Sequence, residues 1–194
     1  MSGTGTPGKG VNVQDLSLHI LDIAENAMSA GASRIDISVK EETGSDLLTL
    51  EVADNGRGMD MSEVERARDP FFTSRTTRRI GLGLPMLEEA AKRANGEMEV
   101  RSAPGEGTVV RATFQRSHID RQPLGNIAAT ITTLIAGRPD IEFTYCHSRD
   151  GQSSEFSTKE LRRETQGMTL NSAAMLSHIM KSLRLGEESL QHNP

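Results

Sequence analysis

Apolar and polar positions follow two different periods in the first part of the chain. In residues 14–30 the apolar side chains recur every three or four positions, which is the spacing of one helix face. Asp15 is suited to cap the start of this helix and Gly31 its end. Apolar and polar residues then alternate at 34–40 and at 47–53, with a polar turn between the two runs. The pattern predicts a helix followed by an antiparallel hairpin.

The same two periods continue as far as Phe114. Ser62 is followed by Glu65 three residues later, which predicts a capping box at the start of a short helix. A longer helix is expected over 84–94 and a second hairpin over 97–114. This order of elements predicts an α+β fold, a two-layer α/β sandwich with helices on one face of a mostly antiparallel sheet.

The pattern changes after Phe114, where a polar stretch precedes an amphipathic helix expected over 124–136. An alternating run with a hairpin turn at Asp150 follows, and Ser157 and Asn171 are expected to cap two further helices. The expected organisation is a disordered lead-in, a first domain, a linker, a small C-terminal α+β module and a frayed tail, at residues 1–12, 13–116, 117–123, 124–185 and 186–194.

Composition narrows the class of protein. The 194 residues carry a formal net charge of −5, which argues against nucleic acid as a general partner. The single cysteine, Cys146, excludes an intrachain disulfide framework and fits a reducing, cytoplasmic compartment. Apolar runs stay well short of the roughly 18 residues needed to span a bilayer, so we expect no membrane partner.

Polar residues on the first predicted helix suit a magnesium ion and a water molecule. Asp22 and Asn26 are four residues apart and share a helix face, and Glu25 lies near them. Mg²⁺ prefers oxygen ligands, which an asparagine carbonyl can provide. A carboxylate one turn away could orient a water or remove its proton. A solvated polar face would produce the same pattern, so this segment alone leaves both interpretations open.

A carboxylate and two glycines follow the strand expected over 47–53. Asp54 stands where the strand ends, and Gly56 and Gly58 allow a positive φ and a close approach of the backbone to a flat ring. A carboxylate at this position can accept a hydrogen bond from an adenine amino group, a contact that discriminates against guanine. A glycine-rich turn before a helix is the alternative interpretation.

A basic stretch lies between the second and third predicted helices. Arg75, Arg78 and Arg79 can neutralise phosphate oxygens, together with neighbouring hydroxyl groups. Gly81 and Gly83 stand at the start of the next helix, where exposed backbone amides suit an anion. The arrangement predicts a mobile phosphate lid, with an ordinary solvated loop as the alternative. It is not a P-loop, because no G-x-x-x-x-G-K-[ST] sequence occurs.

Taken together and in this order, these segments resemble the GHKL ATPase superfamily, which includes histidine kinases, the gyrase B subunit and MutL. The resemblance extends over residues 15–114. The N box, G1 box, F box, G2 box and last glycine motif of the family correspond to residues 21–32, 54–59, 69–73, 81–84 and 105–108. The resemblance implies the Bergerat fold, in which ATP lies between the helices that back the sheet and the lid.

The resemblance also implies a role for each matching residue. Asn26 would be the Mg²⁺ ligand, Asp54 would bond the adenine amino group, and Thr108 would support the adenine end. Asp22 and Glu25 are the catalytic candidates. The nucleotide-binding set implied by the resemblance is Asn26, Ala30, Asp54, Gly56, Gly58, Met59, Phe72, Thr73, Ser74, Arg75, Gly81, Leu82, Gly83, Leu84 and Thr108.

Two departures leave the subfamily open. Members that hydrolyse ATP commonly have glutamate four residues before the Mg²⁺ asparagine, where this chain has Asp22, one methylene shorter. Efficient activation of water is therefore in question, although Glu25 is close enough to replace it. Residues 28–37 are more similar to MutL, whereas the F and G2 boxes are more similar to histidine kinases.

A phosphoacceptor histidine is not expected within this chain. Sensor kinases carry it on a helical hairpin before the ATP domain, and few residues precede the first helix here. The stretch from Ser117 to Leu124 is similar to the kinase phosphoacceptor box, but it follows the ATP domain and Pro123 would interrupt the required helix. We expect His118 to be a surface residue of the linker.

Three functions are compatible with these residues. The first is a histidine kinase-like phosphotransferase that acts in trans on a partner protein, as in the stand-alone anti-sigma-factor kinases that the chain resembles in size. The second is an ATP-driven switch or slow ATPase whose C-terminal module docks a partner without phosphorylating it. The third is an assembly subunit with a vestigial site. ATP and Mg²⁺ are the expected ligands, the expected partner is a protein of unknown identity, and a homodimer stays open.

Overall fold

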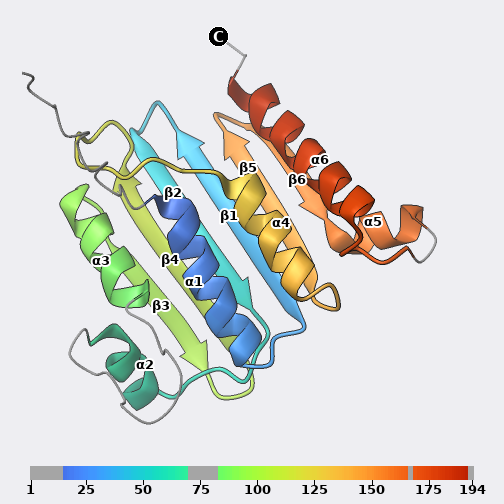
Figure 1. Cartoon of the computed structure of the whole chain (residues 1–194). Helices are drawn as coiled ribbons and strands as arrows, with labels where there is room; N and C mark the ends of the chain where they lie inside the picture. Colours follow the sequence, from blue (N-terminus) through green and yellow to red (C-terminus); the bar gives the residue numbers. More distant parts are fainter. Residues whose placement is uncertain (1–14, 70–82, 166–167, 192–194) are drawn as a thin grey trace, which may run out of the picture.

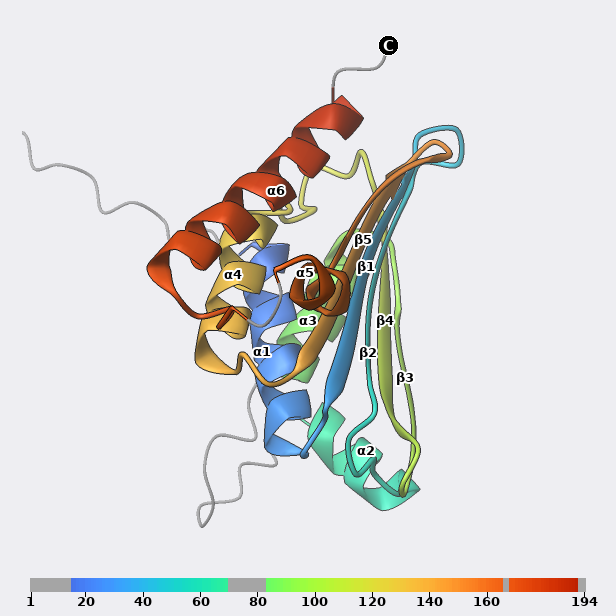
Figure 2. The same cartoon turned by 90° about the vertical axis from the view of Figure 1, so that its right-hand side faces the viewer.

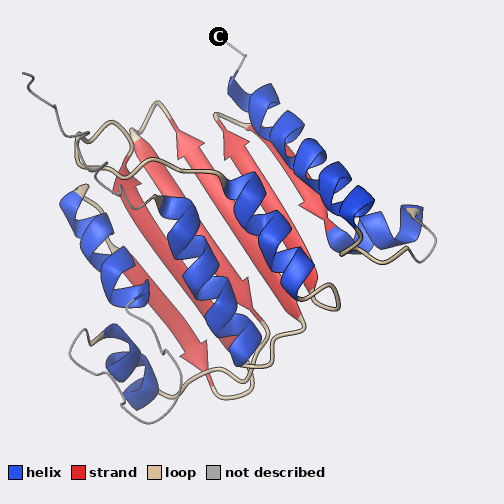
Figure 3. Ribbon diagram, viewed as in Figure 1, coloured by secondary structure: helices blue, strands red, loops and turns tan. Residues whose placement is uncertain are grey.

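The computed structural model describes residues 15–69, 83–165 and 168–191. In this part of the chain a six-stranded sheet forms one layer and helices form the other (Figures 1 and 3). The strands are β1 (Arg34–Glu42), β2 (Leu47–Asp54), β3 (Met98–Ala103), β4 (Gly107–Gln115), β5 (Glu142–Arg149) and β6 (Gln152–Ser157). The helices are α1 (Leu16–Ser29), α2 (Met61–Arg68), α3 (Gly83–Arg93), α4 (Ile127–Gly137), α5 (Thr158–Glu164) and α6 (Ala173–Gln191).

The sheet is mixed, with the strand order β3-β4-β2-β1-β5-β6. β1 and β5 are parallel, and the other neighbouring pairs are antiparallel. This arrangement confirms the predicted α+β fold, a two-layer sandwich with a mostly antiparallel sheet.

The core lies between the sheet and the long helices α1, α3, α4 and α6, which cover the same face of the sheet (Figure 2). Ile35, Ile37 and Val39 of β1 are buried, whereas the two residues between them are half-buried. Leu16 and Ile20 of α1 are fully buried against this face. The alternation of burial along the strand is what the sequence pattern predicts for a sheet with one solvated face.

The first two helices begin at side-chain caps. Asp15 accepts a hydrogen bond from the backbone N–H of Leu18 (3.2 Å), as predicted for α1. The capping box of α2 starts two residues earlier than predicted. Asp60 accepts from the backbone N–H of Glu63 (2.8 Å), and the Glu63 carboxylate accepts from that of Asp60 (3.0 Å). Ser62 instead donates its hydroxyl to the Asp60 carboxylate (2.8 Å), because the extended backbone that a cap requires occurs at Asp60.

The sheet continues beyond the polar stretch at 117–123. β5 pairs with β1, so that Phe143 lies beside Ile35 and Tyr145 lies beside Ile37. The sequence predicts a separate small module from residue 124, but these residues extend the sheet and core of the first domain. Alternation within one strand shows which side is apolar and does not show which sheet the strand joins.

The last helix also differs from the prediction. α6 continues to Gln191, where the sequence predicts a frayed tail over 186–194. Leu190 is buried, and the carboxylate of Glu187 accepts a hydrogen bond from the hydroxyl of Tyr145 on β5 (3.3 Å). The bond between Glu187 and Tyr145 joins the end of the helix to the sheet, and this tertiary contact stabilises the helix beyond its predicted end.

Helices α4 and α6 begin later than their sequences predict. Asn126 caps α4 and accepts from the backbone N–H of Ala129 (3.0 Å). At the start of α6 the hydroxyl of Ser172, the neighbour of the predicted cap Asn171, accepts from the backbone N–H of Met175 (3.3 Å). Serine and asparagine are nearly equivalent as caps, so composition does not choose between adjacent positions.

Candidate functional site

A cavity of about 220 Å³ lies where β2 ends, beside α1, α2, the start of α3 and β4. The residues that line it are Ile23, Asn26, Ala27, Ser29, Ala30, Asp54, Arg57, Gly58, Met59, Ala67, Leu84, Thr108 and Val110. The predicted site residues among them are Asn26, Ala30, Asp54, Gly58, Met59, Leu84 and Thr108. The fold therefore brings together residues from four segments that are distant in the sequence.

Asp54 is the acidic group at the floor of this cavity. It is the last residue of β2 and is paired with Thr108 on β4. Its Oδ1 accepts a hydrogen bond from the backbone N–H of Gly56 (2.7 Å), a buried residue at which an added Cβ would lie 2.9 Å from the same oxygen. Burial raises the pKa of Asp54, and backbone hydrogen bonds from Gly56 and Thr108 act in the opposite direction. These bonds orient a carboxylate that can accept a hydrogen bond from a ligand.

Two glycines allow the loops around Asp54 to cross in direct contact. Gly58 has φ +66°, and a Cβ there would lie 1.9 Å from the carbonyl oxygen of Ala103. Gly107 has φ +81°, and a Cβ there would lie 1.9 Å from the carbonyl oxygen of Asp54. Any side chain at either position would force the loops apart, so both glycines are needed for the shape of the cavity.

Helix α1 supplies the opposite wall. Asn26 lines the cavity, and Asp22 lies one turn earlier, against the start of α3. A Cβ on Gly83 would lie 3.0 Å from the Cβ of Asp22 and 3.3 Å from its Oδ2, so α1 and α3 approach closely at this point. Glu25 is exposed and does not line the cavity. Of the two predicted catalytic carboxylates, only Asp22 faces the N-terminal end of α3.

The predicted phosphate lid falls mainly outside the described residues. Phe72, Thr73, Ser74, Arg75, Gly81 and Leu82 of the predicted site belong to that part of the chain. α2 and α3 are the elements on either side of it, and both reach the cavity, through Ala67 and Leu84.

Helix α2 contacts the rest of the domain through ion pairs and through Ala67, which packs against the core. None of its residues is fully buried. Arg57 of the preceding loop pairs with Glu63 (3.1 Å), and Arg68 pairs with Glu88 of α3 (2.9 Å). Lys92 also pairs with Glu88 (2.8 Å), and the pKa of Glu88 is lowered first by its hydrogen bond with Arg68. Partly exposed ion pairs contribute little stability, and α2 adds no fully buried side chain to the core.

Some lining residues were not predicted from the sequence, namely Ile23, Ala27, Ser29, Arg57, Ala67 and Val110. Ile23 and Ala27 could have been found from helical spacing around Asn26, and Val110 from strand spacing after Thr108. For Ala67 the sequence carries no such signal, because its place depends on how α2 packs.

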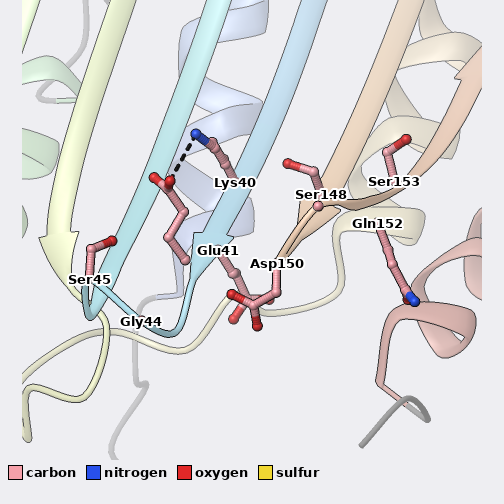
Figure 4. A pocket seen from close by; sticks show the side chains of 10 residues that line it. Lys40, Glu41, Gly44, Ser45, Ser148, Asp150, Gln152 and Ser153 are labelled. Atoms are coloured by element: carbon pink, nitrogen blue, oxygen red, sulfur yellow. Dashed lines mark ion pairs between the residues drawn. The ribbon is translucent and has the colours of Figure 1, made fainter.

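A larger and more open hollow of about 530 Å³ lies at the opposite end of the sheet, beside the β1–β2 and β5–β6 turns (Figure 4). Charged side chains there have partners within the protein. Lys40 forms an ion pair with Glu42 (3.0 Å), and Asp150 accepts hydrogen bonds from the backbone N–H and the hydroxyl of Thr43 (2.7 and 2.8 Å). None of the predicted site residues lines this hollow, so we assign the candidate site to the smaller cavity.

Fold and cavity together define a class of nucleotide-binding α/β sandwich. A carboxylate at the end of a strand, loops in close contact and a helix N-terminus beside an apolar cavity suit a base and its phosphates. The family model of histidine kinase-, DNA gyrase B- and HSP90-like ATPases matches residues 11–118, more than half of the chain. The chain belongs to this family and carries its ATP-binding domain.

Known relatives include sensor kinases and an anti-sigma factor. The chain is 39% identical over 108 residues to the sensor protein kinase FleS of Pseudomonas aeruginosa, which covers 56% of this chain and 26% of that protein. It is 32% identical over 104 residues to the sensor histidine kinase YxdK of Bacillus subtilis, covering 51% and 32%. It is 36% identical over 78 residues to an anti-sigma F factor of Thermoanaerobacter sp., covering 40% and 50%. The matched part is half or less of each relative.

A solved structure of the N-terminal domain of a DNA repair protein has a similar fold. It superimposes with a TM-score of 0.50 at 17% identity, covering 74% of this chain and 52% of that chain. This likeness supports the fold alone. Among the helices of the described residues, none has the length and apolar character needed to cross a membrane.

Proposed function

We propose that this chain is a cytoplasmic, ATP·Mg²⁺-binding regulatory protein that acts as a histidine kinase-like phosphotransferase on a separate partner protein. The observation that carries the proposal is the cavity in which Asp54, Thr108 and Asn26 meet. The sensor kinases and the anti-sigma factor among its relatives support a role in signalling through a protein partner.

The base of the nucleotide would bind at the floor of the cavity. The Asp54 carboxylate would accept a hydrogen bond from the adenine amino group, and Gly58 and Met59 would contact the ring. Guanine presents a carbonyl oxygen instead of the amino group, so two acceptors would face each other. The pocket would therefore prefer adenine nucleotides.

The phosphates would extend toward α1 and the start of α3. Asn26 offers an amide oxygen, which suits Mg²⁺, and no three acidic or histidine side chains form a metal cage among the described residues. A bound Mg²⁺ would neutralise phosphate charge. The backbone amides at the start of α3, near Gly83, would favour the anionic phosphates, and Asp22 would orient the group that attacks.

The acceptor of the phosphoryl group would come from another protein. The phosphates would lie at the start of α3, whereas the backbone N–H of Gln115, three residues before His118, donates to the carbonyl oxygen of Ala94 just after the end of α3 (2.7 Å). The 11 residues of α3 span roughly 16 Å, whereas transfer needs the reacting atoms to be about 3 Å apart. His118 of the same molecule is therefore a poor acceptor.

Radiolabelled ATP distinguishes the proposed reaction from its alternatives. The protein is incubated with γ-labelled ATP·Mg²⁺ and with each protein encoded beside it in the genome, and the products are separated by electrophoresis with and without acid treatment. We expect label on a partner, lost in acid if the acceptor is histidine and retained if it is serine or threonine. Asp54→Asn serves as the inactive control. Label that appears on no protein contradicts the phosphotransferase proposal.

A second function, an ATP-driven switch or slow ATPase, is favoured by the limited burial of α2, none of whose residues is fully buried. This helix lies at the cavity through Ala67 and forms the Arg57–Glu63 and Arg68–Glu88 ion pairs. Nucleotide binding could change its position and with it a docking surface. In that case the labelling experiment yields only free phosphate, and the affinity for a partner depends on ATP.

A further inference from the structure

Ser102 on β3 connects its own strand to two other backbone segments, the loop at Met59 and the start of β4, although it is not among the residues that line the cavity. Its hydroxyl accepts a hydrogen bond from the backbone N–H of Met59 (2.8 Å). It donates to the carbonyl oxygen of Gly107 (2.8 Å) and shares a third hydrogen bond with the hydroxyl of Thr108 (2.9 Å). Met59 and Thr108 both line the cavity, so Ser102 lies directly behind two groups that a ligand would touch.

The number of hydrogens decides the direction of the third bond. A serine hydroxyl has one hydrogen to donate and two lone pairs that accept. The carbonyl oxygen of Gly107 can only accept, so it takes the hydrogen of Ser102. The lone pairs of Ser102 then receive the N–H of Met59 and the hydroxyl hydrogen of Thr108. In this arrangement Thr108 has no hydrogen left for a ligand.

We propose that Ser102 is a specificity-determining positioning residue, which fixes the Thr108 hydroxyl as a hydrogen-bond acceptor on the cavity floor. The inference rests on the proposed function, in which the cavity holds the base of ATP. Asp54 is the partner of Thr108 across β2 and β4, so the two side chains are neighbours. The Asp54 carboxylate and the Thr108 hydroxyl, whose hydrogen is bonded to Ser102, then present only acceptors to a ligand. Such a floor matches the amino group of adenine and gives no direct hydrogen bond to ring nitrogen N1, which is itself an acceptor.

The proposal predicts an unusual response to an ATP analogue. In 1-deaza-ATP a C–H group replaces N1, while the amino group and the triphosphate are kept. Because Thr108 does not donate to N1 in the wild-type protein, calorimetry should give dissociation constants for ATP and 1-deaza-ATP within about twofold. A neutral hydrogen bond to N1 would instead favour ATP by about three- to tenfold. This comparison needs no variant and therefore does not depend on the folding of a mutant.

Removing the Ser102 hydroxyl should create the missing discrimination. In Ser102→Ala the hydrogen of Thr108 is free to reach N1, so the preference for ATP over 1-deaza-ATP should rise to about three- to tenfold. Adding Thr108→Val should return the ratio to about one. Ser102→Thr keeps a hydroxyl and should behave as wild type. Thr113→Val is the matched control, because this hydroxyl of β4 bonds only the backbone of Glu97 in the same hairpin.

The outcomes separate this inference from the function on which it rests. A wild-type preference for ATP of threefold or more, or a folded Ser102→Ala whose ratio stays near one, overturns the role of Ser102 while ATP binding stands. A change that also occurs in Thr113→Val shows a general effect of loosening the hairpin and overturns it as well. Failure of the wild-type protein to bind either nucleotide overturns the proposed function itself, and the inference with it.

Discussion

Replacing Asp54 with asparagine removes the proposed contact with adenine while keeping the shape of the side chain. The amide oxygen of asparagine can still accept the hydrogen bond from the backbone N–H of Gly56, which is 2.7 Å long in the wild-type protein. The other carboxylate oxygen is replaced by an NH₂ group, which donates and does not accept. Two donors would then face each other at the adenine amino group.

The expected loss follows from the strength of a charge-assisted hydrogen bond. A hydrogen bond to a charged group contributes about 1.5–3 kcal/mol, so the dissociation constant for ATP should rise by about 10- to 150-fold. The stability of the free protein should change little. Burial raises the pKa of Asp54, so a neutral amide avoids the cost of burying a charge, but its NH₂ group cannot accept the hydrogen bond from the backbone N–H of Thr108. We expect a melting temperature close to that of the wild type.

Isothermal titration with ATP·Mg²⁺ measures the affinity, and thermal denaturation without ligand measures the stability. Asp36→Asn is the matched control, because Asp36 is on β1 outside the cavity and pairs with Arg34 (3.1 Å). The dissociation constant of Asp36→Asn for ATP should stay within about twofold of the wild-type value. If Asp54→Asn binds ATP as tightly as this control, the carboxylate does not read the base and the assignment is refuted.

Three further predictions concern the shape of the cavity, the reaction and the effect of pH. Gly107→Ala should lower the free energy of unfolding by more than about 2 kcal/mol in urea denaturation and weaken ATP binding, because its Cβ would meet the carbonyl oxygen of Asp54. Gly44→Ala is the control, because its added Cβ meets no atom within 4 Å, and it should change stability by less than about 0.5 kcal/mol. Asp22→Asn should slow phosphate transfer or release by about 100-fold or more with little effect on the affinity for ATP. Glu25→Gln should leave the rate and the affinity unchanged, and equal rates in the two variants would exclude Asp22 as the orienting group. The pKa of Glu41 is lowered from 4.5, first by its hydrogen bond with a buried histidine, so its contribution to stability is complete above pH 4.5 and is lost as the pH falls through the lower folded-state pKa. Glu41→Gln should therefore melt at a lower temperature than wild type at pH 7, and the difference should narrow as the pH falls below 4.5; a difference that is constant with pH would contradict this linkage.

Elements with a simple burial period were predictable from the sequence. The helix expected over 14–30 is α1 at 16–29, and the strands expected over 34–40 and 47–53 are β1 and β2, each only slightly longer. In these segments one face is buried against a single partner layer, so the period of apolar residues directly reports the structure. The order of the chemical groups along the chain also led to the family, because the match depends on short segments rather than on their packing.

Features that depend on packing between distant segments were not predictable in the same way. Both Asp60 and Ser62 have a cap-forming side chain with glutamate three residues later, and only the path of the backbone selects Asp60. Spacing in α1 places Asp22 on the face of Asn26 and Glu25 near it, and the position of α3 is what brings a second element against Asp22. The alternation in β5 does not show that this strand joins β1, which is why the C-terminal part was expected as a separate module.

The central claim is that ATP·Mg²⁺ binds in the cavity at the end of β2, and backbone NMR of the ¹⁵N-labelled protein tests it residue by residue. Addition of ATP·Mg²⁺ should shift the amide signals of Gly56, Gly58 and Thr108, which surround the proposed base site, and leave those of Gly44 and Gly151 at the opposite end of the sheet unchanged. Unchanged signals at the first three residues, or shifts confined to the last two, would contradict the account.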